Sequence, residues 1–151
     1  MHVFRLSVLL AAALLTSACS DKKSIDDASI TLVTLPGGHD IKAEVVMNAA
    51  DMMRGMMFRD SLAPDRGMLF IHGAAGRYSY FMYQVKIPLD MVWIAPDHRV
   101  VEISPNTPPC PSKSARECPN YGGHEAALYV LELAGGTAAK SGVQVGSTVA
   151  F

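Results

Sequence analysis

The sequence predicts a mainly β (α+β) domain, a compact barrel- or sandwich-like antiparallel sheet of about eight short strands with one or two short helices. Two observations lead to this class. Short runs rich in β-branched and aromatic residues recur along the chain, and Gly, Pro, Asp and Asn separate them. Half of the 151 residues are hydrophobic, 18% are charged, and no internal repeat or linker divides the chain, so we expect one packed domain.

Eight runs have the composition of strands. They are residues 29–35, 41–47, 68–71, 78–83, 91–94, 99–104, 127–133 and 146–151. The first two runs flank a glycine-containing turn, PGGHD, and are therefore expected to form a hairpin. The long stretch 105–123 lacks a strand pattern, and loops of that length are usually functional or flexible.

Most of the stretch DMMRGMMFRD (residues 51–60) is expected to lie in a short helix over residues 49–58. Asn48 can cap this helix, with Asp51 three residues further on in a position like that of a capping box. Gly55 costs about 1 kcal/mol relative to alanine inside a helix. Therefore either another part of the backbone approaches closely at Gly55, or the helix ends there.

The N-terminal residues have the pattern of a secretory signal peptide. Arg5 precedes an apolar run of ten residues, LSVLLAAALL, which is too short to cross a bilayer core of about 30 Å. The sequence TSAC that follows resembles a bacterial lipobox, in which the cysteine becomes the first mature residue and is acylated. We therefore expect a signal peptide at 1–18, a lipid on Cys19, a polar tether at 19–28 and one β-rich domain at 29–151. An ordinary cleaved signal with an incidental cysteine is the alternative.

This organisation implies a protein that is exported and lipid-anchored in the cell envelope on the periplasmic side. Ser20 after the cysteine favours the outer membrane if the host is Gram-negative. The membrane is then one partner, through the lipid on Cys19. Nucleic acid is not an expected partner, because the net charge is −1 and no basic run occurs.

The two remaining cysteines, Cys110 and Cys118, are expected to form a disulfide, because export places them where disulfides persist. The bond would close a short loop, a constraint worth about 2.5 kcal/mol in the chain-entropy description. A zinc site with His124 is the alternative, but it lacks a close-spaced cysteine pair and a clear fourth ligand. A redox-active pair is a weaker interpretation, because the spacing is not C-x-x-C.

The methionines allow two interpretations. Met52 and Met56, like Met53 and Met57, are four residues apart and would share a helix face. Thioethers suit Cu(I), which favours copper handling. Methionine is also a flexible filler of apolar cores. Four other methionines lie in the predicted strands and are therefore expected in the core: Met47, Met68, Met82 and Met91.

Two arginines in the same stretch need a partner or a ligand, because charged groups are seldom buried unpaired. Arg54 and Arg59 both flank apolar residues. Each is expected either to pair with a nearby aspartate or to bind an anionic ligand. The aspartates available for such pairing are Asp51, Asp60, Asp65 and Asp90. Asp90 precedes an apolar strand, where a turn or cap residue is common; as a general base it would need a partner.

Several motifs occur in an order that resembles the family called domain of unknown function 192. GMMFR at Gly55–Arg59 is similar to the family's G-L-M-F-R, and YFMYQVKIPLD at Tyr80–Asp90 resembles F-W-M-K-N-T-x-I-P-L-D. The Trp, Lys, Asn and Thr of that second pattern are replaced, with Gln84 in place of the Asn. The resemblance covers roughly residues 30–151. It implies a compact, largely β fold and frequent export, but no reaction.

The combined interpretation is an exported lipoprotein that binds an unknown small molecule or an envelope protein, with no cofactor and no metal site. Its binding surface would comprise residues 51–60, 80–90 and 110–118. The candidate binding residues are Arg54, Met57, Arg59, Met82, Tyr83 and Asp90, with Asp90 as the counter-charge of Arg59. Two alternatives remain: a hydrolase acting on cell-wall or exported peptide material with Asp90 as its base, and a methionine-based copper-handling protein. A binding role without catalysis is favoured over an enzymatic one.

Overall fold

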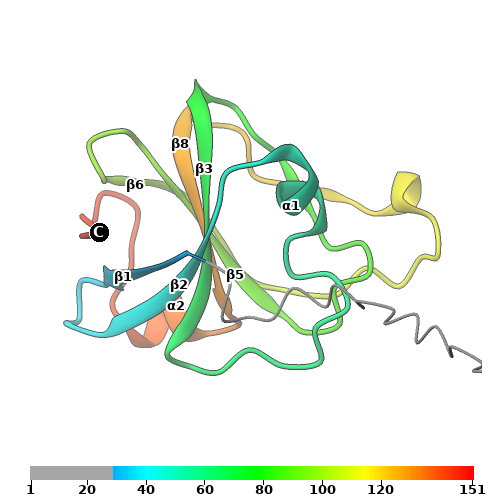
Figure 1. Cartoon of the computed structure of the whole chain (residues 1–151), viewed down its shortest axis with the longest axis horizontal. Coiled ribbons are helices and arrows are strands. Elements are labelled where there is room, and N and C mark those ends of the chain that lie inside the picture. Colours follow the sequence, from blue (N-terminus) through cyan, green and yellow to red (C-terminus); the bar gives the residue numbers. More distant parts are fainter. Residues whose placement is uncertain (1–28) are drawn as a thin grey trace, which may run out of the picture.

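A computed structural model describes residues 29–151 of the chain (Figure 1). The predicted signal peptide, Cys19 and the tether up to residue 28 lie outside the described residues. The strands are β1 (Ile30–Thr34), β2 (Asp40–Val46), β3 (Arg66–Gly76), β4 (Tyr80–Phe81), β5 (Leu89–Ile94), β6 (Val100–Thr107), β7 (Asn120–Tyr121) and β8 (Ala127–Ala134). The helices are α1 (Ala49–Arg54), α2 (Thr137–Lys140) and the 3-10 turn η2 (Ala115–Glu117). Within residues 29–151, no helix has the length and apolar character that a membrane crossing requires.

The main sheet has six strands in the order β1-β2-β3-β8-β5-β6, and β4 pairs with β7 in a small second sheet. The predicted mainly β class is therefore confirmed, as is the hairpin of β1 and β2. One pair in the sheet, β2 with β3, is parallel, so the sheet is mixed and not wholly antiparallel as predicted. Parallel neighbours need a long crossover connection. Residues 47–65, which contain α1, supply this crossover.

The C-terminal segment joins the two edges of the main sheet. Thr34 in β1 and Ala150 exchange two backbone hydrogen bonds of 2.8 and 3.1 Å. At the other edge, the amide of Val100 in β6 donates to the carbonyl of Ser147 at 2.8 Å. The predicted strand at 146–151 is thus present only as two isolated bridges, with Thr34 and Arg99 as the partners. The segment lies between β1 and β6 in Figure 1 and gives the sheet a barrel-like closure.

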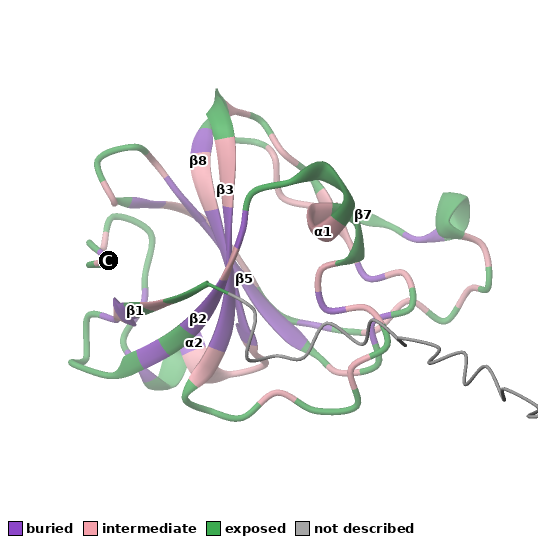
Figure 2. Cartoon of the chain, viewed as in Figure 1, coloured by how far each residue is buried: buried purple, intermediate pink, exposed green. Residues whose placement is uncertain are grey.

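The sheet separates two apolar clusters, because successive side chains of a strand point to opposite faces. On β8, Leu131 and Leu133 belong to one cluster, which we call the barrel core, and Val130 belongs to the other, which we call the helix-side core. The barrel core also contains Val33, Ile41, Leu69, Val92, Ile94 and Val149. The helix-side core also contains Met56, Met68, Phe70, Met82, Met91 and Trp93. Figure 2 shows that the central strands are mostly buried whereas α1 is largely exposed.

The helix in the DMMRGMMFRD stretch is shorter than predicted. The Asn48 side chain accepts a hydrogen bond from the Asp51 amide at 2.9 Å, so the predicted cap is confirmed. The helix ends at Arg54, because Gly55 takes a positive φ of 42° that continues no helix. Met56 is buried, whereas Met53 and Met47 are 65% and 68% exposed. The expectation that Met47 lies in the core is therefore wrong, because the chain leaves the sheet at Val46.

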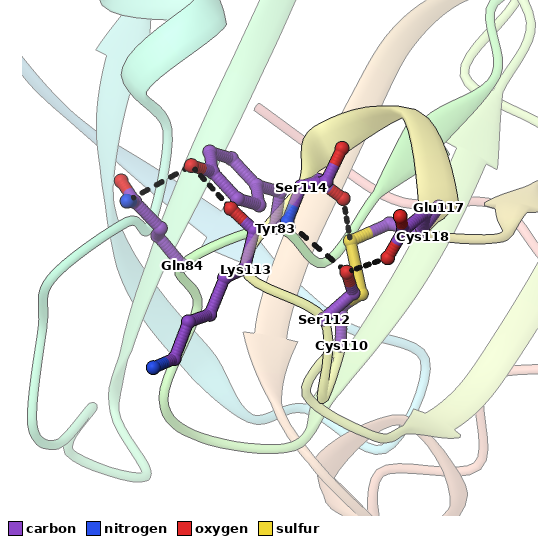
Figure 3. The surroundings of a disulfide bond; sticks show 8 residues. All are labelled: Tyr83, Gln84, Cys110, Ser112, Lys113, Ser114, Glu117 and Cys118. Carbon is purple, nitrogen blue, oxygen red and sulfur yellow. Dashed lines mark hydrogen bonds between the residues drawn. A yellow bond between two sulfur atoms is a disulfide. The ribbon is translucent and has the colours of Figure 1, made fainter.

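The loop after β6 is held by the predicted disulfide between Cys110 and Cys118 (Figure 3). The zinc interpretation is wrong, because both sulfur atoms are bonded to each other and neither is a free thiolate. The Cys110 amide donates to the Met82 carbonyl at 3.2 Å, and the Tyr83 hydroxyl donates to the Lys113 carbonyl at 3.3 Å. The loop is thereby fixed against the chain that follows β4.

The close contact between Gly122 and Trp93 generates a test of this packing. A Cβ atom on Gly122 would lie 2.1 Å from Cζ2 of the fully buried Trp93, and the φ of Gly122 is +66°. Gly122→Ala is therefore expected to lower the free energy of unfolding by about 3 kcal/mol. Urea denaturation followed by tryptophan fluorescence measures this change. Gly73→Ala, where the added atom meets open space, is the control, and equal midpoints for the two variants would contradict the packing described.

Candidate functional site

A cavity of about 290 Å³ lies between α1, the second sheet and the face of the main sheet that carries the helix-side core. Most of its lining is apolar or aromatic. The α1 region contributes Ala49, Met52, Met53, Arg54, Gly55 and Met57. The rest of the lining is Phe70, His72, Tyr78, Ser79, Tyr80, Phe81, Val85 and Glu132. A concave, mainly apolar site with a few polar groups is the usual form of a small-molecule site.

A carboxyl group from the main sheet forms part of the lining. Glu132 lies on β8 directly between Met68 of β3 and Met91 of β5 in the strand register. The same row continues to Glu44 on β2, which is opposite Met68. Glu132 is 6% exposed, and its Oε2 atom has no hydrogen-bond partner. A buried polar atom without a partner is costly and therefore uncommon in native proteins.

The apolar surroundings determine the charge of Glu132. Burial raises the pKa of Glu132 to about 8, because an ionised carboxylate loses its hydration there. The nearby guanidinium of Arg59 acts in the opposite direction and lowers this pKa, but less strongly. At neutral pH the side chain is therefore mostly protonated and presents a neutral carboxyl group to the cavity.

Arg59 is held by a different carboxylate. Its Nη1 and Nη2 atoms donate to Oε1 and Oε2 of Glu44 at 2.6 and 2.7 Å. The side chains are 28% and 10% exposed, so the pair is largely sheltered from water. The hydrogen bonds to Glu44 are the main reason that the pKa of Arg59 is raised above its ordinary value. The fork geometry means that Arg59 and Glu44 neutralise each other.

Two further polar groups line the cavity. The ring of His72 stacks on Tyr78 with a centroid distance of 3.5 Å, and its Nε2 shares a hydrogen bond of 3.1 Å with the Tyr80 hydroxyl. Burial lowers the pKa of His72 and raises the pKa of Tyr80. Both changes favour the neutral forms, so near pH 7 the wall opposite α1 can offer hydrogen bonds without carrying a charge.

Comparison with known proteins places the chain in a family. The sequence pattern of the family DUF192, described as "Uncharacterized ACR", matches residues 32–151. The chain belongs to the DUF192 family. No curated protein matches the chain.

Two solved structures are similar to this DUF192 protein. A protein of unknown function from Novosphingobium aromaticivorans DSM 12444 is 28% identical, with a TM-score of 0.75 over 84% of this chain and 89% of that chain. A protein from Sinorhizobium meliloti 1021, described as a "putative transcription regulator", is 31% identical, with a TM-score of 0.73 over 82% of this chain and 94% of that chain. The resemblance to DUF192 found in the motifs is thus confirmed, and the fold is shared with both proteins.

The DUF192 domain brings only some of the predicted site residues together. Arg54 and Met57 line the cavity, whereas Arg59 does not belong to its described lining and is held by Glu44. Met82 is fully buried in the helix-side core. Tyr83 lies with the disulfide loop, where its hydroxyl also accepts a hydrogen bond of 3.2 Å from the Gln84 amide group (Figure 3). Neither Met82 nor Tyr83 belongs to the described lining of the cavity.

Asp90 is not the counter-charge of Arg59, and that expectation is wrong. Its side chain is fully buried, and its carboxylate accepts backbone hydrogen bonds from Asn106, Gly136 and Ala138 at 2.6, 3.0 and 2.7 Å. These bonds connect the start of β5 to the end of β6 and to the start of α2. Asp90 therefore organises backbone, and it does not belong to the described lining of the cavity.

Sequence reasoning missed Glu132, Glu44 and His72. One signal for Glu132 was present: an acidic residue interrupts the apolar run YVLEL at a position that shares a strand face with Val130. The choice of Glu44 as partner of Arg59 had no comparable signal, because β2 and residue 59 meet only in the folded chain. Within residues 29–151, no group of three His, Cys, Asp or Glu side chains has the arrangement of a metal site.

The raised pKa of Glu132 predicts a characteristic dependence of stability on pH. The stabilising contribution of Glu132 is complete below the ordinary glutamate pKa of 4.5 and is lost as the pH rises toward the native-state pKa of about 8. The reason is that the native state keeps the proton up to a higher pH than the unfolded state does. Relative to Glu132→Gln, the free energy of unfolding of the wild type should fall by about 1 kcal/mol per unit between pH 5 and 7. Urea titrations of both proteins at several pH values measure this difference in the free energy of unfolding. The exposed-site variant Glu125→Gln should follow the wild type, and parallel profiles for wild type and Glu132→Gln would refute the assignment.

The Arg59–Glu44 pair predicts a stability effect in this DUF192 domain. Arg59→Met leaves the sheltered Glu44 without its cation, so the free energy of unfolding should fall by about 2 kcal/mol. Arg54→Met, on the exposed end of α1, should change it by less than about 0.5 kcal/mol. Thermal unfolding at pH 7 compares the two variants. Adding Glu44→Gln to Arg59→Met should restore part of the loss, and a double variant as unstable as the sum of both singles would show that the two side chains act independently.

Proposed function

We propose that this DUF192 protein is a binding module that takes a small, largely apolar molecule into the cavity beneath α1, with Glu132 as a polar contact. The observation that carries this proposal is the buried Glu132 carboxyl, whose Oε2 lacks a partner while the side chain lines an apolar cavity. A ligand with a hydrogen-bonding group would provide that partner.

The neighbours of Glu132 support the view that a glutamate occupies position 132 for function and not for stability. Both cross-strand neighbours in its row, Met68 and Met91, are buried methionines, so this part of the sheet accommodates apolar side chains of similar length. An apolar residue at position 132 would avoid the cost of burying a carboxyl group. Departures of this kind from the best core residue occur at functional sites.

The lining also suits a ligand of variable shape. Met52, Met53 and Met57 lie on the α1 side of the cavity, and methionine side chains adapt readily to different apolar partners. The residue pattern at 1–19 supports a location in the cell envelope, with the module held at the membrane by a lipid on Cys19. In this arrangement the ligand is a small molecule of the envelope, or a side chain of an envelope protein.

Copper handling is the second candidate, because three thioethers and the neutral imidazole of His72 line the same cavity. The cavity volume of about 290 Å³ lies at the lower end of the roughly 300–1,000 Å³ that is usual for small-molecule sites, which favours an organic ligand. Anaerobic titration of the full chain with Cu(I) against a colorimetric chelator distinguishes the two. Stoichiometric Cu(I) binding that Met52→Leu and Met57→Leu abolish would favour copper.

A matched pair of tryptophan variants tests the binding role. Ala49 lines the cavity and is exposed, whereas the exposed Ala50 does not belong to the described lining. Ala49→Trp should therefore close the mouth of the cavity and reduce the amount of bound molecule at least about tenfold, while Ala50→Trp should bind like the wild type. Small molecules extracted from the purified full-length proteins are compared by mass spectrometry. The same molecules in the same amounts from all three proteins would remove the proposal.

A further inference from the structure

We propose that the ligand of the cavity is an organic cation, an ammonium ion with an apolar body, whose charge is balanced by the carboxylate of Glu132. This inference rests on the proposed binding role and specifies the chemistry of the ligand. It follows from the charges around the cavity, from the groups that line it and from the Oε2 atom of Glu132, which has no hydrogen-bond partner.

The side-chain charges along one row of the sheet favour a cationic ligand. Glu44 and Glu132 lie in the same cross-strand row, separated by Met68. Arg59 directs both of its terminal nitrogens at Glu44, so this pair is neutral by itself. When Glu132 is ionised, the three side chains Glu44, Arg59 and Glu132 together carry one net negative charge, and one further positive charge would neutralise it. A proton supplies this charge in the empty cavity, and a cationic ligand supplies it in the occupied one.

The other titratable groups that face the cavity do not supply that charge. His72 on β3 is a neutral imidazole near pH 7, because burial lowers its pKa. Tyr78 and Tyr80 are phenols that carry no positive charge. Arg54 lies at the exposed end of α1, where water screens its charge.

The aromatic lining of the cavity also favours a cation. Phe70, Tyr78, Tyr80 and Phe81 bring four aromatic rings to a cavity with a buried carboxyl group. Aromatic rings attract organic cations, and the sulfur atoms of the methionines beside them are polarisable. An anionic ligand would face Glu132 without a dedicated cation. A neutral ligand would not gain the electrostatic attraction that aromatic rings exert on a cation.

An ammonium ligand would also supply the hydrogen bond that Glu132 lacks. An ammonium N–H donates to the unpartnered Oε2 of Glu132, and hydrogen bonds between two charged groups are roughly twice as strong as neutral ones. Binding in this form releases the proton of Glu132 to solvent, so that the ligand cation replaces the proton. Affinity for the cation should therefore rise with pH, by close to tenfold per unit below pH 8, and level off above it.

Two probes of equal chain length test the inference on the full-length protein: hexylammonium and 1-hexanol. Isothermal titration calorimetry is run between pH 5.5 and 8.5, in buffers of different ionisation enthalpy to count released protons. Hexylammonium is expected to bind at least about tenfold tighter than 1-hexanol at pH 8.5, and to release close to one proton at pH 7. Glu132→Gln should lose this preference and still bind 1-hexanol, whereas the exposed Glu125→Gln should keep it.

The outcomes separate the inference from the binding role. If 1-hexanol binds as tightly as hexylammonium at every pH, the cation inference is overturned and the binding role stands. If hexylammonium binds without pH dependence or proton release, Glu132 is not its partner and the inference also fails. If neither probe binds and no molecule co-purifies with the protein, the binding role fails as well. The wild-type pH series decides between cation and neutral ligand even if Glu132→Gln does not fold.

Discussion

The parallel pairing of β2 with β3 is the constraint on which the cavity depends. Two parallel neighbours cannot be joined by a tight turn, so residues 47–65 must cross over one face of the sheet. That crossover carries α1, the thioethers that follow it and Arg59 onto the helix-side core. The other face is filled by the barrel core, which the C-terminal segment helps to close. The cavity therefore forms where the crossover meets the sheet.

Two buried acids on neighbouring strands show how differently the fold treats a carboxylate. Asp90 is fully buried and receives three backbone N–H groups, which compensate for its lost hydration. Glu132 is buried in a comparable way, but its Oε2 receives nothing and burial raises its pKa to about 8. The first arrangement stabilises backbone. The second has an incomplete set of partners, and this is the physical basis for assigning Glu132, rather than Asp90, to ligand binding.

Local features of the chain could be predicted where near neighbours in sequence decide the geometry. The turn between β1 and β2, the cap at Asn48 and the Cys110–Cys118 disulfide all follow from residues a few positions apart. Predictions failed where segments far apart in the sequence determine which backbone hydrogen bonds or charge pairs form. The expected C-terminal strand shares its hydrogen bonds between two sheet edges and forms only isolated bridges.

By itself the sequence determined the mainly β class, the positions of most strands along the chain and the resemblance to DUF192, because these depend on local composition and spacing. Only the tertiary structure decided which carboxylate meets Arg59 and that Glu132 lines a cavity. The reason is the range of the interactions involved. Strand period and turn chemistry act over a few residues, whereas desolvation and electrostatic interactions depend on which segments fold against each other. Arg59 and Glu132, for example, are 73 positions apart in the sequence, yet Arg59 lowers the pKa of Glu132.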